Sequence, residues 1–501
     1  MGNWFVKQVI DSFLGMFKEM PNRASGSYLE QKSAVIIKNF SRSIFNVETR
    51  HQPFAIDISS GSWNIALHSI FFLISSVGLT LLGYLSFMFS ASTEARTVCL
   101  GFFGRLPAIY PLLSAIFCLL IIISRFSVSY TGWSLFSFFI PNAESGNVIC
   151  RPKSGGPGPK SKLMIFSAHY DTARCLPATG LGILGDLAKR IAKNGLSVFP
   201  TIASIIIFFV FLIHLIFALP AWLSIVLVIL GILALVLIVV EAVLSGQSAN
   251  LPFNPGFNDN LSGVGVLTGI MAQNFPNANP LDSRFVPPEA AAAIRTAPGE
   301  ITFDKTDLIF VFTGSEENGL RGIAEYRANT MKMLEAQYGK DNIFIINLDN
   351  VSGKALKIFN AEKDFAGLKR GGNKEFLDFV AEFINVKRFD EPYLKTFFTD
   401  AEIARHFSKT NAEYSLKLDI DRTFIPSCTD MSGMCSCCDR TRNIITIVGH
   451  ESPAADDYMP RDYHQLTDTY EKMVGGDGEY ISPIYFLVFA LSEFAKHIDK
   501  T

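Results

Sequence analysis

Five short motifs in this chain hold residues of the kinds that bind metal ions. Two of the motifs contain a histidine, and the other three contain aspartate or glutamate. In chain order they read S-A-H-Y-D-T, F-N-D-N-L-S-G, G-S-E-E-N-G-L, N-L-D-N and Y-H-Q-L-T-D-T. Imidazole nitrogens and carboxylate oxygens bind zinc without cysteine, and this number of donors suits two zinc ions with one carboxylate left as a general base. The motifs therefore predict a metal-assisted hydrolytic site.

Each motif taken alone also has an ordinary structural explanation. His169 suits a buried hydrogen-bonded histidine, Asp349 suits a turn or a helix cap, and His464 lies in a polar loop where a solvated histidine is common. The adjacent Glu316 and Glu317 are harder to explain, because neighbouring carboxylates after an apolar strand repel each other unless cations compensate. Only the five motifs together favour a metal centre.

Short apolar runs precede three of the motifs and predict the strands that position them. The runs 163–166, 308–312 and 343–348 are rich in β-branched or aromatic residues, and each ends just before a candidate ligand. Such an order of strands, acids and helices is typical of an α/β sheet that carries a site at the carboxyl ends of its strands. Further expected elements are helices at 260–271, 323–338 and 481–497 and a strand at 444–448.

Four nearly uncharged apolar segments set this chain apart from an ordinary soluble enzyme. Of its 501 residues, 49% are hydrophobic, and the mean hydropathy is +0.28. Each segment is close to the roughly 20 residues that span a bilayer, whereas core helices of soluble domains are mostly amphipathic. The sequence therefore predicts four transmembrane helices in two hairpins, at 65–89, 106–124, 199–219 and 222–240.

These segments divide the chain into an N-terminal part, a membrane part and a catalytic part. The expected domains are an N-terminal segment at 1–62, a first hairpin with its connector at 63–145, and a metal-binding domain at 146–501 that the second hairpin interrupts at 196–245. Lysines and arginines gather on one side of the hairpins. This bias predicts a multi-pass integral membrane protein with its N-terminus and catalytic domain together on the cytoplasmic side.

Three further features complete the sequence reading. Phe5, Val9, Phe13 and Phe17 share one helical face, which suits a helix that lies in the membrane interface or one that docks on the protein. The net charge of −2 does not favour nucleic-acid binding. The chain has eight cysteines, and free thiols or disulfides are favoured over a metal site for the four that are clustered, Cys428, Cys435, Cys437 and Cys438.

The ordered set of motifs, from about residue 163 to the C-terminus, resembles the bacterial leucyl aminopeptidase-type di-zinc exopeptidases. The resemblance implies a three-layer α/β/α domain with a mixed central sheet, two Zn²⁺ per chain and peptide substrates. Combined with the apolar segments, it predicts a membrane-anchored member of that family with the lipid bilayer as a second partner. Oligomeric state stays open.

The resemblance also implies a role for each motif residue. The zinc ligands would be His169 and Asp349 on one ion, Glu317 and His464 on the other, and Asp259 bridging both. Glu316 would be the general base, and Asp171 would fix the imidazole of His169 from behind. Tyr463, directly before the last histidine, would hydrogen-bond the tetrahedral intermediate.

Two departures from the family pattern leave alternatives open. The chain has Thr429, Asp430 and Met431 where the family usually has Ser-Asp-His, and a long segment separates the first two motifs. A single-zinc glutaminyl cyclase is one alternative, although such enzymes usually place tryptophan where Tyr463 stands. A peptidase-fold receptor or scaffold without activity is another, although such relatives typically lose ligands. A membrane-bound zinc aminopeptidase is the function that the sequence favours.

Overall fold

The computed structural model describes most of the chain outside the long apolar segments. Described are residues 2–57, 116, 119, 123, 142–153, 158–175, 252–277, 300–353, 355–363, 369–386, 388–395, 398–410, 413–416, 418–420, 429–434, 441–450, 464–474 and 481–501.

A mixed sheet forms the centre of the domain. Its strands, in spatial order, are β1 (Val47–Asp57), β2 (Asn142–Pro152), β4 (Thr306–Thr313), β3 (Lys162–His169), β5 (Ile343–Asp349), β13 (Asn443–His450), β6 (Ala355–Phe359) and β12 (Leu418–Ile420). The four strands β4, β3, β5 and β13 run parallel, so their carboxyl ends meet at one edge of the sheet. All four strands predicted from apolar runs are therefore present, at the centre of this sheet.

Side chains alternate between the two faces of the sheet, as the two-residue period of a strand requires. In β3, Met164 and Phe166 belong to the larger apolar core, whereas Leu163 and Ile165 belong to a smaller core on the opposite face. Both sets are buried. Apolar side chains thus cover both faces, which explains why these strands read as continuous apolar runs rather than as alternating patterns.

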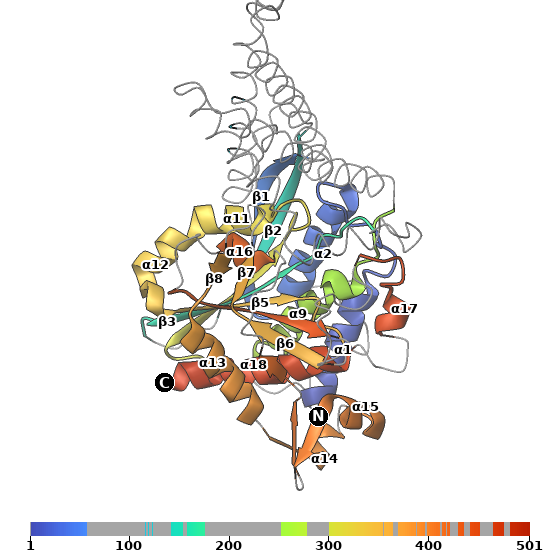
Figure 1. Cartoon of the computed structure of the whole chain (residues 1–501), viewed down its shortest axis with the longest axis vertical. Coiled ribbons are helices and arrows are strands. Elements are labelled where there is room, and N and C mark those ends of the chain that lie inside the picture. The colour runs from blue at the N-terminus through green and yellow to red at the C-terminus, as the bar shows by residue number, and fades with distance from the viewer. Residues whose placement is uncertain are drawn as a thin grey trace, which may run out of the picture.

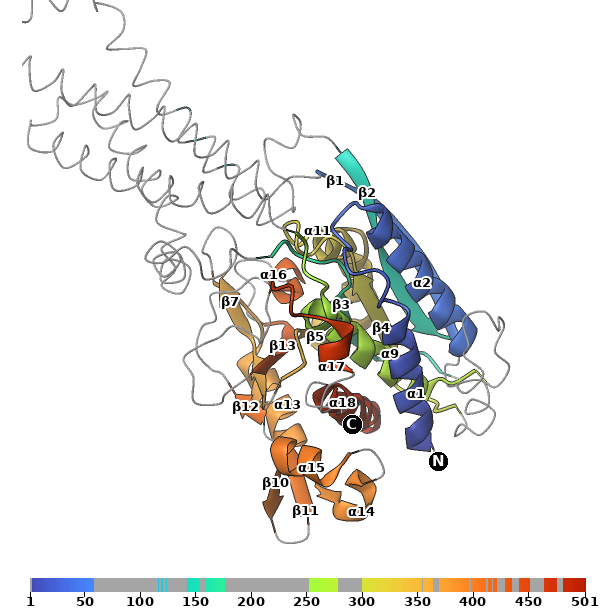
Figure 2. The same ribbon diagram turned by 90° about the vertical axis from the view of Figure 1, so that its right-hand side faces the viewer.

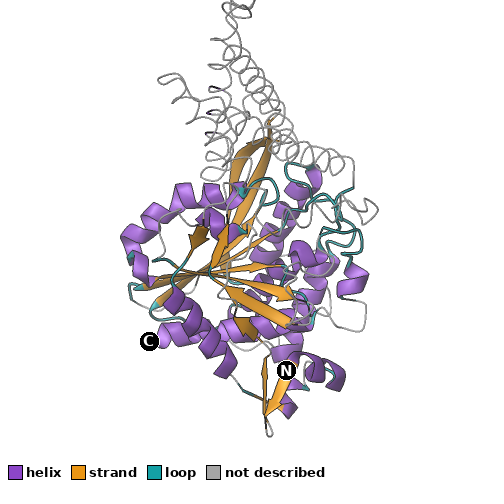
Figure 3. Ribbon diagram, in the orientation of Figure 1, coloured by secondary structure: helices purple, strands orange, loops and turns teal. Residues whose placement is uncertain are grey.

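Helices cover both faces and make a three-layer domain (Figures 1 and 3). The larger core is built with α1 (Gly2–Gly15), α2 (Tyr28–Ile44), α9 (Ser262–Asn274), α13 (Lys374–Val386) and α18 (Ser482–Lys500). The smaller core is built with α11 (Arg321–Tyr326), η6 (Arg327–Met331), α12 (Lys332–Tyr338) and α16 (Asp430–Met434). The helices predicted after Asp259, around residue 330 and at the C-terminal end are all present.

Helix α1 docks on the protein. Phe5, Val9, Phe13 and Phe17, the stripe noted in the sequence, are all buried in the larger core. The helix packs against α9, as Figure 2 shows from the side, and its Asp11 side chain accepts a hydrogen bond from Tyr485 of α18 at 2.5 Å. Of the two expectations for this segment, packing against the domain is the correct one.

Smaller elements surround this framework. A three-stranded sheet, β10-β11-β9, lies beside α14 and α15 at one end of the domain (Figure 2). The bounds of these and the remaining elements are η4 (Phe257–Leu261), η7 (Lys340–Asn342), β7 (Ala361–Lys363), β8 (Lys369–Gly371), β9 (Phe389–Asp390), α14 (Glu391–Leu394), α15 (Asp400–His406), β10 (Phe407–Thr410), β11 (Glu413–Leu416) and α17 (Tyr470–Met473).

Two long segments leave and rejoin the described chain at paired positions. Asp57, at the end of β1, is the register partner of Asn142, at the start of β2. Farther along, Arg174 forms a β-bridge with Phe253, and the Cys175 N–H donates to the Pro252 carbonyl at 2.9 Å. The chain therefore returns to the point it left in both places.

The predicted membrane part of the fold requires correction. A transmembrane helix needs about 20 consecutive apolar residues. Helices α2 and α18, of 17 and 19 residues, both carry charged side chains, and in the described part of the chain no helix has the length and apolarity to cross a bilayer. This finding contradicts the predicted fold with four transmembrane helices and the predicted multi-pass membrane localisation. Apart from residues 116, 119 and 123, the segments 65–89, 106–124, 199–219 and 222–240 themselves lie outside the described residues.

Candidate metal centre

Strand ends bring the first group of candidate ligands together. His169 is the last residue of β3 and Asp349 the last residue of β5, while Glu316 and Glu317 lie in the turn that follows β4. Because these three strands are parallel neighbours, the side chains at their carboxyl ends converge at one edge of the sheet. The edge is the one that the sequence predicts.

Asp259 reaches the same place from a different element. It lies in η4, just before α9, and its peptide bond to Asn260 is cis. The Asp468 carboxylate accepts hydrogen bonds from the backbone N–H groups of Asn258 and Asp259, at 2.5 and 3.1 Å. The Asn350 side chain donates to Asp259 Oδ1 at 3.1 Å and to Asp349 Oδ1 at 2.8 Å. Asp259 is thus fixed both through its backbone and through its carboxylate.

The first half of the centre is His169 with two carboxylates. His169 Nε2 lies 3.4 Å from Asp259 Oδ1 and 3.4 Å from Asp349 Oδ1, but 3.9 Å from Glu316 Oε2. A single imidazole N–H does not satisfy two acceptors equally, whereas ligands about 2.0–2.1 Å from a tetrahedral zinc lie roughly 3.3 Å from one another. These separations fit a metal between His169, Asp259 and Asp349, with Glu316 farther out.

The second half is His464 with Glu317 and the other oxygen of Asp259. His464 Nε2 lies 3.1 Å from Asp259 Oδ2 and 3.2 Å from Glu317 Oε1. Oδ1 of Asp259 therefore faces one histidine and Oδ2 faces the other. A carboxylate placed in this way could bridge two metal ions.

The burial of these groups tests whether metals fit the site. His169 and Asp259 are 2% and 1% exposed, and among the described residues Asp259 Oδ2 accepts no well-formed hydrogen bond. Burial and the neighbouring carboxylate of Glu317 hold the pKa of Glu316 well above its usual range, although the His169 imidazole opposes them. Burial opposes charge on His464 too, but the carboxylates of Glu317 and Asp259 raise the pKa of its imidazole to about 10. Such a surplus of buried acid suits cations, so the donor set fits zinc.

Asp171 supports both halves from behind. Its Oδ1 lies 3.5 Å from His169 Nδ1, although that nitrogen has no well-formed hydrogen bond among the described residues. The same carboxylate also accepts hydrogen bonds from the backbone N–H groups of Glu316 and Glu317, at 3.0 and 3.2 Å. It therefore holds the backbone of the glutamate pair and lies beside the imidazole, and the contact with the glutamate pair is one that the sequence did not indicate.

Some predicted site residues are not part of this cluster. Tyr463 lies outside the described residues, as do the clustered cysteines at 428, 435, 437 and 438. Asp430 is buried, accepts a hydrogen bond from Thr313 Oγ1, and has its pKa raised by burial to about 7. Met431, at the position where the family usually has histidine, packs in the smaller apolar core.

Two residues that hold the ligands in place were not assigned roles from the sequence. Asn350 and Asp468 both lie inside the quoted motifs, N-L-D-N and Y-H-Q-L-T-D-T, so their proximity to the ligands was the available signal. Their contacts depend on which segments meet in the folded chain. Local sequence does not contain that information.

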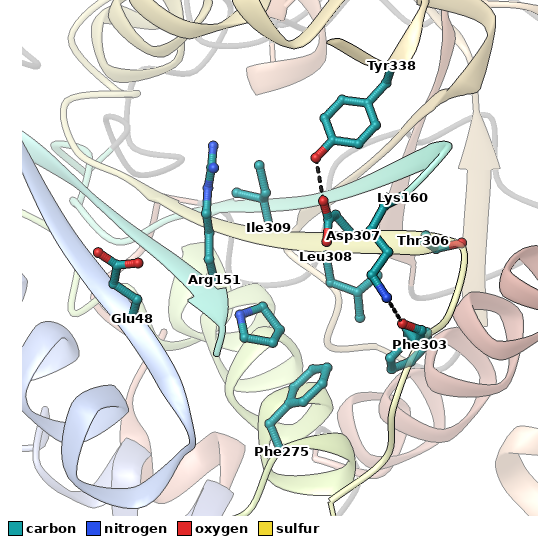
Figure 4. Close-up of a pocket in the computed structure, with 11 residues that line it drawn as sticks. Glu48, Arg151, Lys160, Phe275, Phe303, Thr306, Asp307, Leu308, Ile309 and Tyr338 are labelled. Atoms are coloured by element: carbon teal, nitrogen blue, oxygen red, sulfur yellow. Dashed lines mark hydrogen bonds between the residues drawn. The ribbon is translucent and has the colours of Figure 1, made fainter. Parts of the chain in front are cut away.

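A separate hollow of about 170 Å³ lies near the start of β4 and contains none of the candidate ligands (Figure 4). Lys160 donates there to the Phe303 carbonyl, and Tyr338 donates to Asp307. Because none of the candidate ligands lines it, the hollow does not compete with the candidate metal centre as the catalytic site.

Comparison with known proteins gives similarities in structure only. No family model matches the sequence, and no curated protein matches it. A zinc aminopeptidase from Bacillus subtilis gives a TM-score of 0.42 at 10% identity, covering 98% of this chain and 95% of that one. Fimbriiglobus ruber glutaminyl cyclase gives 0.41 at 9% identity, with coverages of 97% and 93%. The Legionella pneumophila LapA aminopeptidase gives 0.39 at 9% identity, with coverages of 99% and 72%. At such scores these similarities decide neither family nor activity, which have to be inferred from the metal centre.

Proposed function

We propose that this chain is a zinc-dependent aminopeptidase that removes N-terminal residues from peptides at a two-zinc site. The observation that carries the proposal is the position of Asp259. Its two oxygens lie 3.4 Å and 3.1 Å from the Nε2 atoms of two different histidines. A bridging carboxylate between two histidine and carboxylate pairs is what a co-catalytic zinc pair requires.

The residues that would hold the zinc ions divide into two sets. His169 and Asp349 would hold one ion, Glu317 and His464 the other, and Asp259 both. Bound zinc would supply Lewis-acid polarisation of the scissile carbonyl and a lowered pKa for water.

Glu316 is the candidate general base. Its carboxylate lies 3.9 Å from His169 Nε2, whereas those of Asp259 and Asp349 lie 3.4 Å from the same atom. It would accept a proton from the attacking water and return it to the leaving amine. Tyr463, next to His464 in sequence, is proposed to donate a hydrogen bond to the tetrahedral intermediate.

The decisive experiment compares zinc content and hydrolysis in the wild type and in Glu316→Gln. The full chain would be assayed on a panel of aminoacyl chromogenic substrates. Glu316→Gln should lower kcat by about 10²- to 10⁴-fold while zinc content stays unchanged, because it removes the base and spares the ligands. Glu493→Gln, on the surface of α18, is the matched control and should retain activity.

Other outcomes would identify a different function. One zinc per chain, with cyclisation of N-terminal glutamine in place of hydrolysis, would mean a glutaminyl cyclase. Neither zinc nor turnover would mean a peptidase-fold receptor or scaffold. Equal activity in the wild type and in Glu316→Gln would remove Glu316 from the mechanism.

A further inference from the structure

Arg23 is a fully buried cation that lies between two of the ligand-bearing segments. Its Nε donates to the carbonyl of Tyr170 at 2.9 Å, and Tyr170 lies directly between His169 and Asp171. Its Nη1 and Nη2 donate to the carbonyls of Pro255 and Gly256, at 2.9 and 2.8 Å, just before Asp259. One planar guanidinium thus joins the backbone that carries His169 to the backbone that carries Asp259.

The backbone of Arg23 strengthens the connection. Its N–H donates to Thr172 Oγ1 at 3.1 Å, and the Thr172 N–H donates back to the Arg23 carbonyl at 3.2 Å. The N-terminal segment is therefore bonded to the chain on the far side of Asp171 through main-chain and side-chain groups together. A single broken contact would not release it.

Neighbouring residues of the same segment reach the other ligand-bearing turn. Ser25 Oγ donates to Asp171 Oδ2 at 2.8 Å, and the carboxylate of Glu30 accepts from the Ser315 N–H at 2.9 Å. Ser315 directly precedes the glutamate pair. Residues 23–30 thus contact the segments that carry His169, Asp259 and Glu316, through the backbone of Tyr170, Gly256 and Ser315.

Gly256 shows that the Asp259 segment is shaped to admit this guanidinium. Its φ of +69° lies in the left-handed region, and a Cβ there would come within 2.6 Å of Arg23 Nη2 and 2.3 Å of Thr172 Cγ2. Any residue with a side chain would push the guanidinium or Thr172 away. The close approach therefore depends on the absence of a side chain at this position.

Burying a guanidinium is costly unless its donors are satisfied. The hydrogen bonds of Arg23 all go to backbone carbonyl oxygens, those of Met20, Tyr170, Pro255 and Gly256. The planar guanidinium therefore holds several backbone groups at fixed positions, rather than only pairing with a carboxylate. Burial lowers the pKa of Arg23 to about 10 while nearby carboxylates oppose that shift, so the group stays charged at neutral pH. The guanidinium therefore contributes both a positive charge and a planar set of hydrogen-bond donors beside the candidate metal centre.

We propose that Arg23 is a positioning residue that sets the separation between His169 and Asp259 and thereby the zinc affinity of the centre. The inference rests on the proposed function. It goes beyond that function because Arg23 contacts no ligand side chain and lies outside every motif. The two ligands it aligns are separated in sequence by the long segment 176–251. Backbone hydrogen bonds between Cys175 and Pro252 and between Asn254 and Ala173 join their segments at one end, and Arg23 joins them closer in sequence to the ligands, at Tyr170 and Gly256.

The test is a zinc titration of metal-free full-length protein, with a chromophoric chelator as competitor. Arg23→Met should weaken zinc binding about 10- to 100-fold, the usual effect of losing a residue that supports metal ligands from behind. Arg23→Lys should give an intermediate affinity, because an ammonium keeps the charge but lacks the fork that spans both segments. The matched control is Arg174→Met, which removes an exposed guanidinium 4.3 Å from the Phe253 ring in the same region and should bind zinc like the wild type.

Circular dichroism in the presence of chelator would establish that each variant is folded before the titration. If Arg23→Met does not fold, Thr172→Val replaces it, because this nearly isosteric change removes only the hydroxyl that accepts from the Arg23 N–H. Thr172→Val should weaken zinc binding severalfold. Wild-type affinity in the folded Arg23→Met, or in Thr172→Val when Arg23→Met is unfolded, would overturn the inference, as would an equal loss in Arg174→Met. A wild type that binds no zinc would overturn the proposed function and this inference together.

Discussion

The two halves of the metal centre are built differently. His169 and Asp349 end neighbouring strands, so strand pairing fixes their backbones before any ion binds. Glu317 and His464 lie in turns, and His464 has a positive φ of 51°. The turn that holds Glu317 depends on hydrogen bonds to the side chains of Asp171 and Glu30. We infer that the strand half is preorganised and that the turn half depends on its supporting carboxylates.

Removing Asp259 should weaken zinc binding in the strand half and in the turn half alike, because both halves share this carboxylate. Asp259→Ala deletes both facing oxygens and should lower kcat/KM by about 10³-fold or more, since the stabilisation from both ions is worth several kcal/mol. Zinc content by elemental analysis and kinetics on an aminoacyl substrate would measure the effect. Retention of two tightly bound zinc ions would show that Asp259 does not bridge.

Removing one histidine at a time should reveal the asymmetry directly. His464→Ala should keep one tight zinc in the strand half, whereas His169→Ala should keep a zinc in the turn half that binds about tenfold or more weakly. Each variant should lose about 10²-fold in kcat/KM, because a single ion stabilises the transition state less than a pair. Zinc titration would compare them, and equal residual affinities would contradict the inferred preorganisation.

Asp171→Asn should sharpen the comparison by weakening the turn half more than the strand half. The amide loses one of the acceptors for the Glu316 and Glu317 N–H groups, so zinc affinity should fall about 10- to 100-fold. We expect the larger loss in the turn half. Tested in the His464→Ala and His169→Ala backgrounds, a loss confined to the strand half would mean that Asp171 acts only on the imidazole of His169.

The smallest expected effect is on pH dependence. Because the folded-state pKa of His464 is raised from 6.5 to about 10, its ion pairing stabilises the metal-free protein fully below about pH 6.5 and is lost as pH rises through about 10. Zinc needs the neutral imidazole, so its binding to the turn half should release a proton and strengthen about tenfold per pH unit between about pH 7 and pH 9. Titration at several pH values would measure this slope. A flat profile would contradict the protonated state.

The strand half was also the more predictable half. Apolar runs ending at His169 and Asp349 identified both strands and the shared edge, because the buried faces of a strand and its length leave a local pattern. The turn half was inferred from the order of the motifs and from the family resemblance. A polar turn has no repeating pattern of apolar residues that would predict it. The prediction of transmembrane helices was wrong, since no helix in the described part of the chain can cross a membrane. The length and apolarity of a segment do not by themselves decide where it lies in the folded protein.

Contacts between distant segments were beyond the reach of the sequence. Arg23 sits in an N-terminal segment with no motif, and its acceptors lie near residues 170 and 256. Asp468 is one acid in an acid-rich loop until the fold brings it to the backbone of Asp259. The residues that hold the candidate ligands in place come from segments that are remote in sequence. Local spacing therefore does not predict them.

The paired ends of the two long segments also have a practical meaning for protein engineering. Asp57 and Asn142 already face each other across β1 and β2, so a two-residue turn such as Asn-Gly would connect them in the geometry of a tight hairpin. A short linker between Cys175 and Pro252, whose backbones are hydrogen-bonded, would do the same at the second place. The three-layer domain therefore offers two natural junctions for a shortened chain of one continuous domain.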